Sequence, residues 1–292
     1  METGKHTTCF FVADLHGVYA QYQKLFAAIA DEQPHAVFLG GDLLPSGMMA
    51  LASPDFFHED FVNKVLASGF LKLKSQMGDR FPGVFLILGN DDGRMEEAAI
   101  LDAAGRGAWQ YSHNRKIEFQ DYVVYGYSCV PPSPFQLKDW ERYDVSRFVD
   151  PGCTAPDEGF HSVPVSRHEL KYATIKKDLE VLTDNDDLAN AIFLFHTPPY
   201  QTKLDRAALD GKMIDYAPLD VHIGSIAVRR LIEQRQPLLT LHGHVHESAR
   251  LTGEWKDRIG QTVMLSAAHD GEELALVRFD PANPAAATRE LI

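Results

Sequence analysis

Short runs of apolar residues recur along the chain, separated by longer stretches in which polar residues are frequent. Within each run the apolar residues are nearly continuous and do not alternate with polar ones. Such runs are typical of strands that are buried on both faces. The sequence therefore predicts strands at 7–14, 36–42, 83–90, 122–128, 191–196, 237–243, 262–268 and 273–279.

Segments with a helical repeat lie between several of these strands. In 18–32, apolar residues such as Leu25 and Ile29 fall on one stripe, and similar stripes predict helices at 166–183 and 226–234. Strands that alternate with helices indicate an α/β fold. The more closely spaced strands late in the chain indicate a second β-rich layer.

Residues 129–165 lack a strong period and are rich in proline and aromatic residues. A long ordered loop of this kind often carries function, and its basic and aromatic side chains could shape a substrate pocket. The side chains concerned are Lys138, Trp140, Arg142 and Tyr143. The alternative is a surface excursion that is packed by its own aromatic residues.

The overall composition restricts the partners. The chain has 292 residues and a net charge of -13, which disfavours binding to nucleic acid or to an anionic membrane surface. A phosphate-bearing substrate stays open if bound cations reverse the local field. Three widely spaced cysteines and the lack of a signal peptide or membrane span lead us to expect a cytoplasmic protein.

Polar side chains directly follow several of the predicted strands. They are Asp14 and His16, Asp42, then Asn90, Asp91 and Asp92, His196, and finally His242, His244 and His246. In open α/β sheets, ligands bind outside the carboxyl ends of the strands. If these strands belong to one sheet, side chains that are far apart in the sequence would converge at one rim.

Aspartate, asparagine and histidine together offer oxygen and imidazole ligands without a thiolate. This set suits manganese, iron, zinc or nickel. Each residue alone has an ordinary explanation, because Asp14 or Asp42 could cap a helix and His196 could be a hydrogen-bonded core histidine. Together, however, so many buried charged groups would be costly without a cation.

The segment "LLTLHGHVHES" (238–248) places three histidines within five residues. In an extended segment, His244 and His246 would point the same way and could each serve one of two adjacent metals. Gly243 would allow a tight backbone there. His242 would point elsewhere, so we do not expect it to be a ligand.

The ordered motifs "DLH", "GGD", "GND", "HTPP" and "GHVH" between residues 14 and 246 resemble the calcineurin-like metallophosphoesterase family. The downstream segment "HIGSIAVRRLIEQRQPLLTLHGHVHES" is similar to the branch described as Icc-related predicted phosphoesterases. The resemblance implies a single domain over residues 1–292. It also implies a four-layer α/β/β/α sandwich with two central mixed sheets flanked by helices.

The resemblance further implies a site for two metal ions, with manganese or iron favoured over zinc or nickel. The first ion would be held by Asp14, His16, Asp42 and His246, and the second by Asn90, His196 and His244, with Asp42 bridging. A hydroxide between the ions would attack the phosphorus atom.

One position departs from the family pattern. Many members have a histidine after the asparagine, which assists the leaving group, whereas this chain has Asp91. An aspartate near two cations is a poor proton donor, so the candidate catalytic residues are Asp91 and His222 as a substitute acid. His222 precedes Gly224 and Ser225, where a helix N-terminus could bind an anion. The alternative is a surface histidine beside an ordinary helix cap.

The sequence therefore predicts a metal-dependent phosphoesterase that acts on a small phosphodiester or activated phosphate ester. One alternative is a phosphomonoesterase, including one like the Ser/Thr protein phosphatases. The other is a non-catalytic, metal-binding interaction module.

Overall fold

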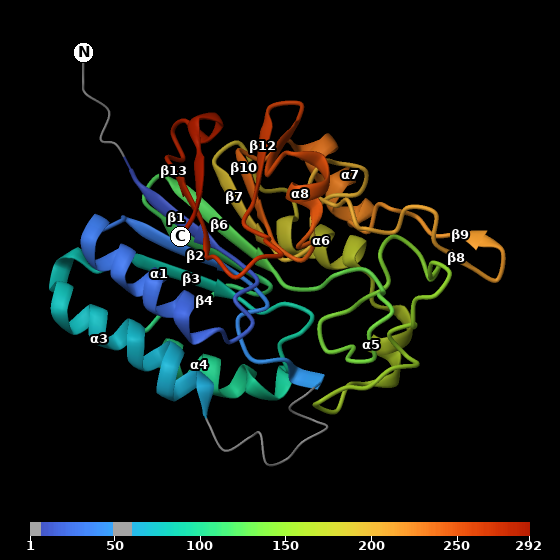
Figure 1. Cartoon of the computed structure of the whole chain (residues 1–292), viewed down its shortest axis with the longest axis horizontal. Coiled ribbons are helices and arrows are strands. Elements are labelled where there is room, and N and C mark those ends of the chain that lie inside the picture. The colour runs from blue at the N-terminus through green and yellow to red at the C-terminus, as the bar shows by residue number, and fades with distance from the viewer. Residues whose placement is uncertain (1–6, 49–59) are drawn as a thin grey trace.

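A computed structural model describes residues 7–48 and 60–292 of the chain. Two six-stranded sheets pack face to face, and helices cover the outer face of each sheet (Figure 1). The expected four-layer α/β/β/α arrangement with two mixed sheets is confirmed. Within the described ranges, no helix has both the length and the apolar character needed to cross a membrane.

The first sheet has the strand order β14-β13-β1-β2-β3-β4. Its strands β1 to β4 are parallel, whereas β13 and β14 are antiparallel to their neighbours. The strands are β1 (Cys9–Val12), β2 (Ala36–Gly40), β3 (Gly83–Ile87), β4 (Gln110–Tyr111), β13 (Ala275–Phe279) and β14 (Thr288–Leu291).

The second sheet has the strand order β11-β12-β10-β7-β6-β5. Its four central strands are parallel, and the two edge strands are antiparallel to their neighbours. The strands are β5 (Arg115–Phe119), β6 (Tyr122–Tyr127), β7 (Ala191–Phe195), β10 (Leu239–His242), β11 (Lys256–Ile259) and β12 (Thr262–Ser266).

Helices α1, α3 and α4 cover the first sheet, and α6 and α7 cover the second (Figure 1). Their bounds are α1 (Tyr19–Glu32), α3 (Ser68–Met77), α4 (Glu97–Gly105), α6 (Ile175–Thr183) and α7 (Ile226–Arg235). The smaller elements are a π-helical turn (Val62–Ala67), 3-10 turns (Gly78–Arg80, Arg94–Glu96, Pro284–Ala286), α5 (Arg167–Tyr172), α8 (Ser248–Thr252) and a projecting hairpin of β8 (Met213–Ile214) and β9 (Ala217–Pro218).

Alternate residues of the central strands serve two different interfaces. In β1, Cys9 and Phe11 belong to the core between the sheets, whereas Phe10 and Val12 belong to the core beneath the helices. Because both faces of such a strand are buried, its sequence is apolar throughout instead of alternating.

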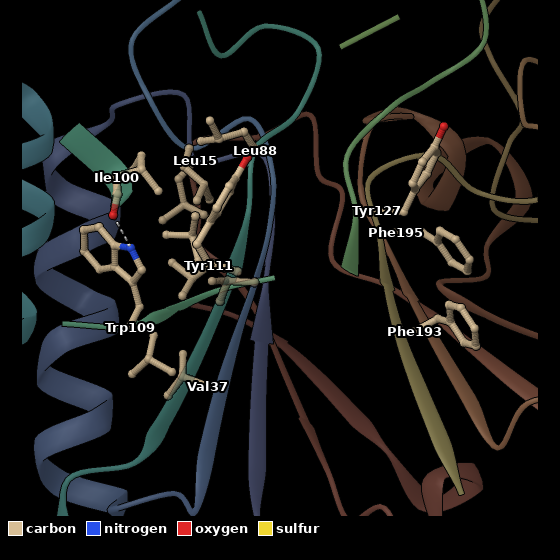
Figure 2. Close-up of a cluster of buried hydrophobic side chains, with 14 of the residues drawn as sticks. Leu15, Val37, Leu88, Ile100, Trp109, Tyr111, Tyr127, Phe193 and Phe195 are labelled. Atoms are coloured by element: carbon tan, nitrogen blue, oxygen red, sulfur yellow. Dashed lines mark hydrogen bonds between the residues drawn. The ribbon is translucent and has the colours of Figure 1, made fainter. Parts of the chain in front are cut away.

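Figure 2 shows side chains of the cores beneath the helices. On the side of the first sheet, Trp109 donates a hydrogen bond from Nε1 to the carbonyl oxygen of Ile100 at 3.1 Å. On the side of the second sheet, Phe193 and Phe195 stack with ring centroids 5.0 Å apart. Each buried side chain of this size contributes roughly 1.5–3 kcal/mol to folding, so these cores hold the strand ends in place.

All the predicted strands are present, although each is shorter than its apolar run. The expectation that the strands with candidate ligands form one sheet is wrong. Strands β1, β2 and β3 belong to the first sheet, whereas β7 and β10 belong to the second. The apolar pattern could not reveal this, because a strand in either sheet is buried on both faces.

The predicted helices at 18–32 and 226–234 are confirmed, whereas the one at 166–183 is divided into α5 and α6. The break lies at Thr174, which has an extended backbone, and its Oγ1 accepts a hydrogen bond from the backbone N–H of Lys177. This cap begins α6. The sequence pattern missed helices α3 and α4 and the edge strands β4, β5, β11 and β14.

Residues 129–165 form a long irregular segment beyond the carboxyl end of β6 (Figure 1). The expectation that its basic and aromatic side chains shape a substrate pocket is wrong, because Lys138, Trp140 and Tyr143 are at most 2% exposed. Arg142 instead forms ion pairs with one acidic side chain of α5 and one of α6. The alternative is confirmed in part, because Trp140 and Tyr143 are buried whereas Phe135, Phe148 and Phe160 are exposed.

His113 lies in the turn by which the chain passes from the first sheet to the second. Its Nδ1 accepts a hydrogen bond from the backbone N–H of Ser128 at 3.0 Å, which only an unprotonated Nδ1 can do. Burial and the nearby side chains of Arg142, Arg94 and Arg115 lower the pKa of His113 to about 3. Between pH 6.5 and 3, His113 is therefore neutral in the folded chain and protonated in the unfolded chain.

We expect His113 to make the fold sensitive to acid. The stabilisation is complete above the ordinary histidine pKa of 6.5 and is lost as the pH falls from 6.5 towards 3. Between pH 7 and 5 the wild type should lose up to about 2 kcal/mol more free energy of unfolding than His113→Asn. Urea unfolding of both proteins at each pH measures this difference, and parallel pH curves would contradict it.

Candidate metal centre

The residues that follow β1, β2, β3, β7 and β10 converge where the carboxyl ends of the two sheets meet. Backbone hydrogen bonds connect these loops, including Asp14 N to Gly41 O at 3.0 Å and Gly243 N to His196 O at 2.9 Å. Strand ends that belong to different sheets therefore build one site.

Four side chains form a first set of ligand atoms, all within 4.8 Å of one another: Asp14, His16, Asp42 and His246. The Nε2 atom of His16 lies 3.2 Å from Nε2 of His246 and 3.9 Å from Oδ2 of Asp42. The Nε2 atom of His246 also lies 3.5 Å from Oδ1 of Asp14. Two imidazole nitrogens and two carboxylates around one point suit a transition metal.

The remaining expected ligands, Asn90, His196 and His244, gather on another side of Asp42. The Nε2 atom of His196 lies 3.1 Å from Oδ1 of Asn90 and 3.3 Å from Oδ2 of Asp42. The rings of His196 and His244 have centroids 5.2 Å apart. Oδ2 of Asp42 therefore faces His16 of the first set and His196 of the second, which is the position of a bridging ligand.

The surroundings of His196 fit a cation. Its Nδ1 lies 2.8 Å from the carbonyl oxygen of Gly40, which can only accept, so Nδ1 carries the proton in the neutral ring. Nε2 then presents a lone pair towards the side-chain oxygens of Asn90 and Asp42. Three acceptors that face one another are stabilised by a metal ion, so the donor set fits one.

Asp14 and Asp42 are buried carboxylates, at 7% and 3% exposure. Burial alone would raise the pKa of Asp42, but His196 and His16 hold it well below its usual range. Despite the opposing effect of burial, Asp91 and Asp42 raise the pKa of His16 to about 9, and Asp42 and Asp14 raise that of His196 to about 9. Without metal, protonated imidazoles balance the carboxylates, and a bound metal would displace those protons.

Four of the candidate ligands have a left-handed backbone. The φ angles are 58° for Asp14, 43° for His16, 51° for Asp42 and 73° for His244. Non-glycine residues seldom adopt this conformation, and it tends to occur at functional sites. The φ of His244 also shows that the expected extended segment is wrong, because a tight turn after β10 presents His244 and His246.

A glycine and a buried aspartate hold the loops after β2 and β3 together. A Cβ atom on Gly89 would lie only 2.4 Å from Oδ1 of Asp42, so no larger residue fits. The carboxylate of Asp92 accepts hydrogen bonds from the backbone N–H groups of Leu43 at 3.0 Å and Leu44 at 2.7 Å. Sequence reasoning assigned Asp92 no role, because its partners lie in a distant loop.

His242 is fully buried and lies apart from both sets of ligands. Its Nδ1 lies 2.9 Å from the carbonyl oxygen of Thr197, and its Nε2 lies 2.7 Å from Oγ1 of Thr240. Both ring nitrogens are therefore occupied, as expected for a histidine that is not a ligand.

Of the two candidate catalytic residues, Asp91 lies beside the first set of ligands, with its Oδ2 atom 3.3 Å from Nδ1 of His16.

His222 is oriented by a buried carboxylate, since its Nδ1 lies 2.8 Å from Oδ1 of Asp205. The expectation that the adjacent helix N-terminus binds an anion is wrong. The carboxylate of Asp144 already accepts hydrogen bonds there, from Ile226 N at 2.7 Å and Ser225 Oγ at 2.6 Å. Sequence reasoning missed both aspartates, because neither lies in a recognisable motif.

Comparison with known proteins agrees with this geometry. The chain matches the family model described as calcineurin-like phosphoesterase over residues 8–248. It is also 32% identical over 82 residues to the uncharacterized protein MJ1162 of Methanocaldococcus jannaschii, a match that covers 27% of this chain and 32% of that protein. The matched part thus spans about a third of the relative's length.

Two solved structures share the fold over 98% of this chain and 99% of their own. One crystal structure has a TM-score of 0.59 at 14% identity. The other, the protein TT1561 of Thermus thermophilus, has a TM-score of 0.52 at 15% identity. At such low identities the likeness concerns the fold alone.

We expect Asp42→Asn to weaken both metal sites, because the bridging position loses its negative charge. Isothermal titration of chelator-treated protein with Mn²⁺ should show both affinities reduced by at least the ~10–100-fold that loss of an outer partner typically costs. Asp102→Asn is the matched control, since that side chain is 70% exposed on α4. Undiminished binding of two ions by the Asp42 variant would contradict a bridging role.

Proposed function

The chain belongs to the calcineurin-like phosphoesterase family, and from this premise we propose that it hydrolyses a phosphodiester or an activated phosphate ester with two bound metal ions. The observation that carries this proposal is the pair of ligand sets that share Asp42. Suitable side chains occupy every ligand position that the family resemblance implies. A relic that has lost turnover usually loses some of its ligands.

The side chains have separate tasks in this proposal. When bound, two such metal ions supply an activated water at neutral pH and neutralise charge on the phosphoryl group. The carboxylate of Asp14 also accepts a hydrogen bond from the backbone N–H of His244 at 2.9 Å, which holds the loop after β10 against the loop after β1. The carbonyl oxygen of Gly40 orients the ring of His196 through its contact with Nδ1.

Asp91 favours a diester over a monoester as the substrate. Its carboxylate is 29% exposed beside His16, at the position where many family members have a histidine. A monoester dianion brings one more negative charge to this carboxylate than a diester monoanion does, so repulsion disfavours the monoester. For this reason we rank phosphomonoesters, including phosphoproteins, second.

The remaining partners follow from donor chemistry and charge. Nitrogen and oxygen ligands without a thiolate suit manganese, iron, zinc or nickel, and the family resemblance favours manganese or iron among them. A net charge of -13 favours a small phosphate ester over nucleic acid. The three cysteines are free, which suits a reducing compartment such as the cytoplasm.

We expect metal-reconstituted protein to prefer a diester. On Mn²⁺- or Fe²⁺-loaded protein, kcat/KM should be at least ~10-fold higher for bis-p-nitrophenyl phosphate than for p-nitrophenyl phosphate, which corresponds to about 1.4 kcal/mol. Asp42→Asn should abolish both activities. A preference for the monoester would favour a phosphomonoesterase, and no turnover with both metals bound would favour a binding module.

We also expect activity to rise steeply as the pKa of the leaving group falls, because the usual histidine is absent at position 91. If His222 supplies the proton, His222→Ala should lower kcat/KM by ~10²-fold or more for alkyl esters and little for nitrophenyl esters. His168→Ala, a change at an exposed histidine of α5, serves as the control. A leaving-group dependence that is the same in His222→Ala as in the wild type would show that His222 does not assist departure.

A further inference from the structure

We propose that Asp91 is a positioning residue for the metal ligand His16, and that it does not protonate the leaving group. The inference rests on the proposed function only in requiring that the first ligand set binds a metal. It assigns a physical role to the one motif position at which this chain departs from the family pattern.

Four contacts fix Asp91 against other parts of the site. Its backbone N–H donates to Oδ1 of Asp42 at 2.8 Å, and its carbonyl oxygen accepts from the backbone N–H of Gly47 at 2.7 Å. Its Oδ1 accepts a hydrogen bond from Oγ of Ser46 at 2.7 Å, and its Oδ2 lies 3.3 Å from Nδ1 of His16. Each carboxylate oxygen therefore has a polar partner within the site.

The contact with His16 controls how that ring presents itself to a metal. Nε2 of His16 faces the first ligand set, 3.2 Å from Nε2 of His246, whereas Nδ1 faces Asp91. A neutral imidazole can bind a metal through Nε2 only when its proton is on Nδ1. A carboxylate that accepts the Nδ1 proton selects this tautomer, fixes the ring and makes Nε2 a stronger donor.

The hydroxyl of Ser46 extends this chain of contacts by one step. Because it donates to Oδ1 of Asp91, it keeps Oδ2 turned towards His16. The contacts run in the order Ser46, Asp91, His16 and metal. We therefore expect the replacement of a residue to weaken metal binding less, the further that residue lies from the metal. A purely structural role would not produce this order in metal affinity.

The two metal sites should also differ in affinity. His196 of the second set has a neutral partner on Nδ1, the carbonyl oxygen of Gly40 at 2.8 Å. His16 of the first set has the negatively charged partner Asp91. Since a carboxylate increases the donor strength of a ligating histidine more than a carbonyl does, we expect the first site to bind metal more tightly.

The test measures metal binding without any substrate. Chelator-treated wild type, Asp91→Ala, Asp91→Asn and Ser46→Ala are titrated with Zn²⁺ by calorimetry, and Asp102→Asn is the control. We expect Asp91→Ala to weaken one of the two sites by ~10–100-fold and to leave the other unchanged. Asp91→Asn, which keeps an acceptor oxygen, should have a smaller effect, Ser46→Ala the smallest, and Asp102→Asn none.

A spectroscopic readout reports on the ring itself. In ¹⁵N-histidine-labelled, Zn²⁺-loaded protein, His16 is assigned by its absence in His16→Gln. The wild type should show a protonated Nδ1 with a slowly exchanging proton, and Asp91→Ala should show faster exchange of that proton. Asp91→Asn keeps nearly the same volume, so it tests the same trend with little disturbance of the fold.

Two results would overturn the proposal. One is that all variants bind both ions as the wild type does, with the proton on Nδ1 of His16 equally protected. The other is that metal binding is unchanged while Asp91→Asn lowers kcat/KM only for esters with poor leaving groups, which would identify Asp91 as the acid. Lack of turnover by the wild type on every ester would count against the proposed function, but it would leave these binding readouts intact.

Discussion

The burial of two carboxylates, Asp14 and Asp42, at one point is the constraint on which the rest of the site depends. Like charges repel, and both groups lose most of their hydration, so the arrangement is unstable without positive charge between and around them. The rings of His16 and His196 can supply that positive charge as protonated imidazoles, and they can instead bind a metal ion in that place. Protonation of these rings and metal binding would therefore compete.

The scaffold supplies the rigidity that this constraint demands. Four candidate ligands have a left-handed backbone, and such residues cost of order 1–3 kcal/mol each. Strands that are buried on both faces hold the ends from which these residues emerge, so the loops have little freedom to relax. Gly89 allows the loops after β2 and β3 to approach closely, and Asp92 then connects them through backbone hydrogen bonds.

Several aspartates hold loops together from inside the protein, so not all of the acidic residues contribute charge to the surface. Asp92, Asp144 and Asp205 are held inside the protein, where each accepts several hydrogen bonds from backbone N–H groups of neighbouring loops. The carboxylate of Asp91 differs from these, because it is partly exposed and contacts two side chains, the Ser46 hydroxyl and the His16 ring. Part of the formal charge of -13 therefore belongs to aspartates that lie inside the protein and hold its loops, while the remainder faces solvent and repels polyanions.

The sequence by itself determined the inner strands of both sheets and the residue types of the metal centre, because double-sided burial and polar strand ends are local properties. The four-layer order followed from the resemblance to the family. It also singled out position 91 as a departure from the family pattern. Tertiary structure decided that the ligand-bearing strands belong to two sheets, that the histidines after β10 lie on a tight turn, and that Lys138, Trp140 and Tyr143 are buried in their own segment. It also decided the partner of Asp91, since the contact with His16 joins residues that are distant in the chain and have no shared periodicity. Such contacts depend on how loops pack against one another, and no local pattern of apolar and polar residues encodes that packing.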